Sequence, residues 1–211
     1  MKKLIRFLSY LLGLGILSLG VILNTRTGYG VSPLNSMPYA ISEIFHYKLG
    51  TITIVFYTFY VAIEMLLIGK ILDIKLLMQV PCGIVFGMYT NLFSNLITYE
   101  PSNHSLRIVL LALAIFLTAL GVVITVNMNL VPNPPDGLTD LIGKKMNKDF
   151  GFAKNMFDSS SIVMTILLCL LLSDHIIGIG VGTVVSVLMI GRTAAWLNKR
   201  WKDKLQIIGN W

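Results

Sequence analysis

The stretch Leu19–Pro33 reads LGVILNTRTGYGVSP, and 101 residues later Leu120–Pro134 reads LGVVITVNMNLVPNP. The same offset, with no gap, aligns the whole first half of the chain with the second. The first-half residues with an identical partner 101 positions on include Arg6, Leu19, Gly20, Val21, Pro33, Ile41, Gly50, Phe56, Leu66, Leu67, Asp73, Val80 and Met88. The sequence therefore predicts two structural repeats, residues 1–101 and 102–211.

The composition is that of an integral membrane protein. Hydrophobic residues make up 55% of the chain and charged residues 13%, with a mean hydropathy of +0.76, whereas a soluble domain carries about 25% charge. Each half is too short to bury a core of its own. We therefore expect a single transmembrane domain over residues 1–211, with the lipid bilayer as its main partner.

A membrane-spanning helix needs about 20 apolar residues. Six segments meet or nearly meet this need, which gives three predicted spans per repeat. They are Leu4–Leu23, Thr51–Gly69, Leu76–Thr98, Leu106–Val126, Asn155–Leu172 and Ile176–Leu197. An odd number of spans per repeat makes the two halves enter the membrane from opposite sides. The predicted fold is an all-α membrane protein with six transmembrane helices in a 3+3 inverted repeat.

The basic residues predict the orientation, because Lys and Arg favour the cytoplasmic side. With the N-terminus inside, fourteen fall on the inner side and three on the outer side. The inner ones are Lys2, Lys3, Arg6, Lys70, Lys75, Lys144, Lys145, Lys148, Lys154, Arg192, Lys199, Arg200, Lys202 and Lys204, and the outer ones are Arg26, Lys48 and Arg107. We expect a multi-pass protein of the cell membrane with both termini cytoplasmic. Topology thus explains the net charge of +7 without a nucleic-acid partner.

A broken or re-entrant segment is predicted at equivalent positions of the two repeats. Residues 24–35 and 125–137 contain Gly or Pro next to short polar residues, and each is followed by about a dozen residues of plausible helix. Asn35 and Asp136 are placed to cap these short helices. Their N-termini would present free N–H groups to an anionic or polar solute. The alternative is an amphipathic helix lying at the membrane surface.

Several polar residues are candidates for solute binding. Glu64 lies within an apolar span, where a carboxyl group indicates solute contact or proton coupling unless it snorkels or bonds a neighbouring helix. Its equivalent in the second half is Thr165, so the repeated architecture does not carry repeated chemistry. The predicted binding residues are Pro33, Asn35, Glu64, Pro134, Asp136, Asp158, Asn24, Asn127 and Asn91.

No motif points to catalysis. The chain has no P-loop, no Gly-x-Ser-x-Gly and no His-Glu-x-x-His. Its three His and two Cys show no metal-ligand spacing. We therefore expect a protein that is not an enzyme and needs no metal or cofactor.

Short motifs resemble those of the YczE/YyaS/YitT group of bacterial membrane proteins. They are Gly28-Tyr-Gly-Val-Ser-Pro33 with Gly50, Pro134-Pro-Asp-Gly-Leu138, Asp158 and Gly180-Val-Gly-Thr183. The chain departs from that group where Leu34 and Asn35 replace an aromatic-acidic pair and Pro135 replaces a basic residue. The resemblance implies a multi-span, transporter-like protein and supplies no substrate.

Three functions remain open on the sequence. The first is a transporter that moves a small polar or ionic solute by alternating access. The second is the solute-binding membrane subunit of a multi-component vitamin importer. The third is a non-transporting membrane scaffold whose polar residues only pair helices. The sequence leaves the oligomeric state open.

Overall fold

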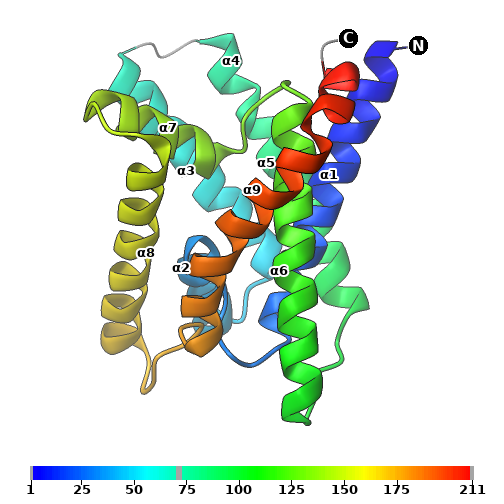
Figure 1. The fold of residues 1–211 in the computed structure, drawn as a ribbon. Helices are drawn as coiled ribbons and strands as arrows, with labels where there is room; N and C mark the ends of the chain where they lie inside the picture. Colours follow the sequence, from blue (N-terminus) through cyan, green and yellow to red (C-terminus); the bar gives the residue numbers. More distant parts are fainter. Residues whose placement is uncertain (1, 70–72, 210–211) are drawn as a thin grey trace. The chain divides into compact units, whose positions relative to one another are not determined.

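The computed structural model describes residues 2–69 and 73–209, and these residues form helices joined by loops, with no strand among them (Figure 1). The helices are α1 (Lys2–Thr25), α2 (Pro33–Phe45), α3 (Leu49–Ile68), α4 (Ile74–Leu77), α5 (Gln79–Leu96), α6 (His104–Asn127), α7 (Pro134–Lys145), α8 (Phe150–Leu172) and α9 (Val181–Gly209).

Within the described residues, five helices are long and apolar enough to cross a membrane, namely α1, α3, α6, α8 and α9. The predicted continuous span Leu76–Thr98 is wrong, because the chain breaks at Met78 between α4 and α5. Pro81 explains the break, since its ring clashes with the carbonyl of Leu77 and it has no N–H to donate there. The remaining helix, α5, is shortened and carries Gln79, Asn91 and Asn95.

The helix boundaries follow the offset of 101 residues. α2 begins at Pro33 and α7 at Pro134, while α3 begins at Leu49 and α8 at Phe150. α1 pairs with α6, and α5 with α9, to within two residues at their starts. Both expected short helices are present. Neither α2 nor α7 is among the helices long enough to span.

The chain divides into two compact units, and each unit draws on both repeats. The first unit contains residues 1–32, 89–130 and 180–211, and the second contains residues 33–88 and 131–179. The first unit thus holds α1, α6, α9 and the end of α5, and the second holds α2, α3, α4, α7, α8 and the start of α5.

In the first unit, α1 and α6 pack antiparallel along their length (Figure 1). Gly13 faces Thr125 and Gly20 faces Thr118, so rising numbers on α1 meet falling numbers on α6. A Cβ on Gly20 would lie 2.5 Å from the Thr118 nitrogen, and a Cβ on Gly121 would lie 2.5 Å from the Leu17 nitrogen. These two contacts are equivalent under the 101-residue offset. Equivalent residues contact each other reciprocally in this way about a two-fold axis.

Arginines near the starts of α1 and α6 obey the same reciprocity. The Arg6 Nε donates to the Met128 carbonyl oxygen at 2.7 Å, at the C-terminal end of α6. Its equivalent Arg107 lies beside Gly28, just past the end of α1. A cation at a helix C-terminus is favoured by the helix dipole. The Arg6 bond thus ties the start of α1 to the end of α6, whereas the Arg107 Nε donates to the Pro101 carbonyl, just before α6, at 2.6 Å.

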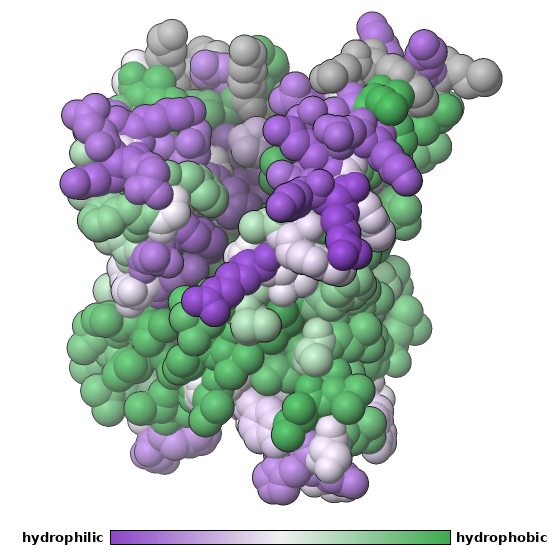
Figure 2. Space-filling view, in the orientation of Figure 1, coloured by the Kyte–Doolittle hydropathy of each residue, from purple (hydrophilic) through white to green (hydrophobic). Residues whose placement is uncertain are grey.

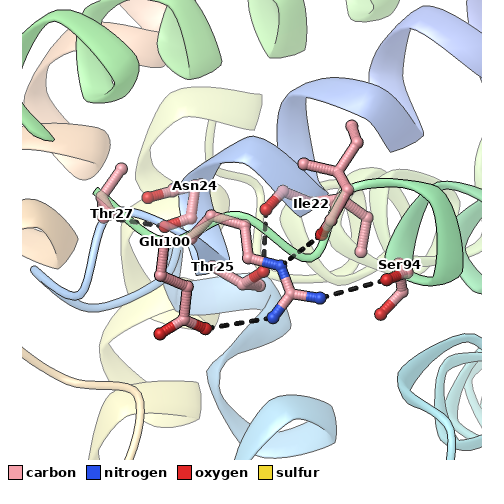
Figure 3. Close-up of polar contacts among 8 residues, drawn as sticks. Ile22, Asn24, Thr25, Thr27, Ser94 and Glu100 are labelled. Atoms are coloured by element: carbon pink, nitrogen blue, oxygen red, sulfur yellow. Dashed lines mark hydrogen bonds and ion pairs between the residues drawn. The ribbon is translucent and has the colours of Figure 1, made fainter. Parts of the chain in front are cut away.

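Arg26 joins the end of α1 to the end of α5, and Figure 3 labels two of its partners, Ser94 and Glu100. Its Nε donates to the Ile97 carbonyl at 2.7 Å, its Nη2 donates to the Ser94 carbonyl at 3.1 Å, and its Nη1 pairs with Glu100 at 3.1 Å. The bonds to the two carbonyls satisfy backbone groups that the end of a helix leaves unpaired.

In the second unit, the short helices α2 and α7 each contact both long helices, α3 and α8. The outward surfaces of the long helices are apolar: Figure 2 shows hydrophobic residues over the C-terminal half of α8, where Leu167, Leu170, Leu171 and Leu172 are exposed. A helix surface that exposes aliphatic side chains and no polar ones is suited to contact with lipid.

Candidate functional site

The N-cap residue of α7 differs from the predicted one. Asn133 occupies the N-cap position, Pro134 is the first helical residue, and Asp136 is the third, so the prediction that Asp136 caps the helix is wrong. Asn35 likewise lies inside the first turn of α2, which begins at Pro33. Proline takes the first position because its φ already suits the helix and the N–H it lacks has no partner there.

This turn does not offer free N–H groups to an anion. Pro134 and Pro135 have no N–H, and the N–H groups of Asp136 and Gly137 both donate to the Asn133 carbonyl at 2.9 Å. The prediction that this turn presents free N–H groups to an anionic or polar solute is therefore wrong for its N–H groups. The groups that this turn does present are oxygen atoms.

A buried carboxyl group contacts the turn from α3. The Glu64 side chain is 1% exposed, and its Oε2 accepts a hydrogen bond of 2.6 Å from Nε2 of Gln79, the first residue of α5. A Cβ built on Gly137 would lie 2.5 Å from Glu64 Oε1. Glycine at this position thus allows the carboxyl group to lie directly against the backbone of α7.

Three buried oxygen atoms around the turn have no hydrogen-bond partner among the described residues. They are Glu64 Oε1, Gln79 Oε1 and Asn133 Oδ1. The Asn133 side chain also lies within hydrogen-bonding reach of the Tyr57 hydroxyl. A buried polar atom left unpaired costs about 1–3 kcal/mol, so a native fold that keeps several together calls for a functional explanation.

Asp136 carries the charge of the turn. Burial raises the pKa of its carboxyl group above the usual range; the positive charge of Lys154 opposes this rise and the negative charge of Asp158 adds to it. Lys154 itself pairs with Asp158 at 2.8 Å on α8. Asp136 and Asp158, both predicted to bind solute, therefore act on each other electrostatically within the second unit.

Aromatic rings line the same part of the second unit. Tyr57 stacks on Phe86 with the ring centroids 5.3 Å apart, and Tyr60 meets Phe157 edge to face at 5.5 Å. Tyr57 and Tyr60 are both buried. Tyrosine faces beside carboxyl groups suit a positively charged organic group, which the ring quadrupole attracts.

The equivalent position in the other repeat has different chemistry. Ser36 and Thr165, which correspond to Gly137 and Glu64, share a buried hydroxyl–hydroxyl hydrogen bond of 2.8 Å. Each hydroxyl also lies 2.7 Å from a backbone carbonyl oxygen on its own helix, Ser36 from that of Pro33 and Thr165 from that of Ser161, so one hydroxyl donates across the pair and the other donates to its carbonyl. The Ser36–Thr165 pair is thus fully hydrogen-bonded, whereas the equivalent pair, Gly137 and Glu64, leaves one carboxyl oxygen without a partner.

Replacing Thr165 with Val should destabilise the protein by about 1 kcal/mol, because it removes one partner of the buried hydroxyl pair and keeps the volume similar. Thermal unfolding in detergent would measure the shift. Thr58→Val is the matched control, since the Thr58 hydroxyl is exposed and bonds only its own helix. Equal shifts for the two variants would show that the Ser36–Thr165 contact contributes nothing.

The predicted binding residues do not all come together. Pro33, Asn35, Glu64, Pro134, Asp136 and Asp158 belong to the second unit, whereas Asn24, Asn91 and Asn127 belong to the first. Asn24 is buried and bonds Ser186 at 3.2 Å. Asn127 donates to the Val123 carbonyl and to Asn198 Oδ1, both at 2.8 Å. These two asparagines join helices of the first unit, and Asn91 is half-buried on α5.

Gln79 and Asn133 are the site residues that sequence reasoning missed. Gln79 stood at the apparent start of a continuous span, and its partner Glu64 lies 15 positions earlier on another helix. Asn133 precedes a Pro-Pro pair, and its position as the N-cap was the available signal. The interruption at Met78, which Pro81 causes, makes Gln79 the first residue of a helix, where a polar side chain is expected.

The comparison with protein families gave one match. Residues 4–199 match the family described as a family of unknown function, DUF6198. The chain belongs to this family. Comparisons with curated proteins and with solved structures gave no match. Membership of DUF6198 covers nearly the whole chain, including every residue of the site around α7, and brings no activity with it.

Proposed function

We propose that this DUF6198 protein is a membrane transporter that binds a small solute, rich in hydrogen-bond donors and carrying a positive charge, at the first turn of α7. The observation that carries the proposal is the buried, unpaired Oδ1 atom of Asn133, the N-cap residue of the turn that holds Asp136. A donor-bearing solute satisfies such an oxygen, and the ionised Asp136 supplies the opposite charge.

The reciprocal contacts of α1 and α6 support a transport mechanism. Antiparallel packing of equivalent helices is what a 3+3 inverted repeat requires, and inverted repeats bind solute at interrupted helices near the membrane midplane. We propose that α5 is the sixth span and that α2 and α7 are the interrupted segments. Each compact unit contains equivalent elements of both repeats, so the moving part in alternating access would be a unit and not a repeat.

Charge within the first unit supports cytoplasmic termini. Gly209 near the end of α9 lies against Asn127 at the end of α6, where Arg6 also binds. The start of α1 and the end of α9 therefore lie together. Lys2, Lys3, Arg6, Lys199, Arg200, Lys202 and Lys204 fall at this end, which the preference of Lys and Arg for the cytoplasmic side identifies as inner. Lys70, part of the same count, lies outside the described residues.

The resemblance to the YczE/YyaS/YitT group is in keeping with this proposal. Its second motif, Pro134–Leu138, contains Asp136 and Gly137, and its acidic position is Asp158. A shared architecture would explain why these positions fall at one site. Two other functions remain as outcomes of the test: the membrane subunit of a vitamin importer and a scaffold.

A thermal-shift screen on the purified protein tests the proposal. Amines, guanidines, amino acids, vitamins and nucleosides would be titrated, and a true ligand raises the melting temperature with its concentration by linkage. We expect a shift from a donor-rich cation, and its loss in Asp136→Asn. Ser160→Ala is the matched control, because the Ser160 hydroxyl is exposed on α8 and bonds only the Phe157 carbonyl. A flat response across all classes would sink the solute-binding proposal.

Flux measurements then separate the three functions. Liposomes that contain the protein alone should take up the solute found in the screen if the protein is a transporter. Binding without uptake would identify an importer subunit. If the protein neither binds nor takes up a solute, the scaffold is the function that remains.

Solute affinity should depend on pH through Asp136. Because burial raises the pKa of Asp136, the carboxyl group stays protonated at pH values where a free aspartate is ionised. A cationic solute binds the ionised form, so affinity should rise as pH rises through the raised pKa and fall below it. Isothermal titration across a pH series would measure this, and Asp136→Asn should flatten the profile.

A further inference from the structure

We propose that Glu64 carries a proton, as the acid partner of a closed acid–amide pair with Gln79, and that this proton is the one coupled to transport. The inference rests on the proposed function for its coupling role, but the protonated state stands on geometry alone. It concerns the two atoms that the solute site leaves unexplained, Glu64 Oε1 and Gln79 Oε1.

The hydrogen-bond inventory of the pair requires a proton. Gln79 presents one donor group and one acceptor, whereas an ionised carboxylate presents two acceptors. One hydrogen bond exists, from Gln79 Nε2 to Glu64 Oε2 at 2.6 Å. The other two oxygens are buried and unpaired. Rotating the amide by 180° would only exchange which oxygens face each other.

One proton on Glu64 completes the arrangement. A Cβ on Gly137 would lie 2.5 Å from Glu64 Oε1 and 3.1 Å from Gln79 Oε1, so both oxygens border the same point. A proton on Glu64 Oε1 lets that hydroxyl donate to Gln79 Oε1, which pairs all four polar atoms in a ring of two hydrogen bonds. The step forms one O–H bond on Glu64 and breaks one O–H bond of a hydronium ion, which becomes water.

The cost of burial favours the same state. Glu64 and Gln79 are each 1% exposed, and Glu64 lies on an apolar helix long enough to span the membrane. An ionised carboxyl group there costs several kcal/mol more than a neutral, hydrogen-bonded one. The structure has no cation paired with Glu64 among the residues it describes, and the three salt bridges found there involve other acids.

The surrounding charges do not offset this cost. The charged side chains described on the elements packed against α3 are Glu43 on α2, Asp73 beside α4, and Asp136, Asp140, Lys144 and Lys145 on α7, and the neutral titratable groups there are Tyr39 on α2 and Cys82 and Tyr89 on α5. Asp140 acts electrostatically on Glu64 and is itself paired with Lys144, and Glu43 is exposed. The Asp140 side chain is 47% exposed, so it places a water-accessible carboxyl group one turn beyond Gly137 on the same helix.

Infrared spectroscopy of the protein in liposomes reads the protonation state directly. A protonated carboxyl group has a C=O stretching band that a carboxylate lacks. We expect this band at neutral pH in the wild-type protein and its loss in Glu64→Gln, which keeps both hydrogen bonds of the ring as an amide pair. Thr165→Val, at the equivalent position of the other repeat, should leave the band unchanged. If the band of the wild-type protein persists unchanged in Glu64→Gln, the proposal is overturned.

Gln79→Leu provides a second, independent readout. Removing the amide leaves the Glu64 acid without its partner, so its C=O band should move to higher frequency, as weaker hydrogen bonding requires. An unmoved band would show that Gln79 does not pair with the acid, which contradicts the ring.

Pyranine-loaded liposomes test the coupling. Solute uptake by the wild-type protein should change the internal pH, while Glu64→Gln should still exchange solute but no longer move protons. Solute uptake without any pH change in the wild-type protein would overturn the coupling and leave the transporter intact. An infrared band without solute flux would leave the proton site and overturn the proposed function.

Discussion

Gly20→Ala and Gly121→Ala should each destabilise the protein by about 3 kcal/mol, at the upper end of the cost of overfilling a packed contact. In either variant the new methyl group would lie 2.5 Å from a backbone nitrogen of the facing helix. No side-chain rotation relieves such a contact, so α1 and α6 must move apart. Unfolding in detergent, followed by circular dichroism, would measure the loss.

Gly191→Ala is the matched control for these variants. A Cβ at Gly191 meets nothing within 4 Å, and alanine is the better helix former by about 1 kcal/mol. The control should be as stable as the wild-type protein or more so. In the double variant Gly20→Ala/Gly121→Ala, the second substitution should cost less than the first, because the helices have already separated. Full additivity would mean that the two contacts are independent, against the reciprocal arrangement.

Glu64→Ala should destabilise the protein by about 3 kcal/mol, while Glu64→Gln should leave its stability unchanged. The alanine variant removes a buried side chain and leaves the Gln79 amide without any partner, and each of these changes has a cost. The glutamine variant keeps the shape and both hydrogen bonds. Unfolding of the two variants beside the wild type would measure the difference, and a loss as large for Glu64→Gln as for Glu64→Ala would contradict the neutral pair.

The repeated elements were predictable because the sequence repeats them. The paired breakers around Pro33 and Pro134 predicted a short helix in each repeat, although both helices begin three residues earlier than the predicted caps Asn35 and Asp136 imply. Pro81 predicted a kink near the inner end of the span Leu76–Thr98, where the helix is interrupted at Met78, but hydropathy alone makes the span look continuous because the residues on both sides are apolar. Pro81 was the signal, since proline ends the helix four residues upstream.

The candidate site was predictable in part. Glu64 and Asp136 stood out as acids in apolar surroundings, and both lie at the first turn of α7 or against it. Gln79 was invisible because its role depends on how α5 folds back towards α3. The free N–H groups predicted at the start of α7 are absent, since Pro134 and Pro135 have no N–H and those of Asp136 and Gly137 bond the Asn133 carbonyl. Helix position was thus readable from pattern, but hydrogen-bond partners required the fold.

Charge displacement by the protein in liposomes on a solid support tests the transporter claim most directly. After the thermal-shift screen has identified a donor-rich cation, a rapid jump in its concentration should produce a current in the wild-type protein. The current should vanish in Asp136→Asn and persist in Ser160→Ala. A wild-type protein that binds the cation and gives no current, or an equal current in Asp136→Asn, would contradict a transporter whose site is the first turn of α7.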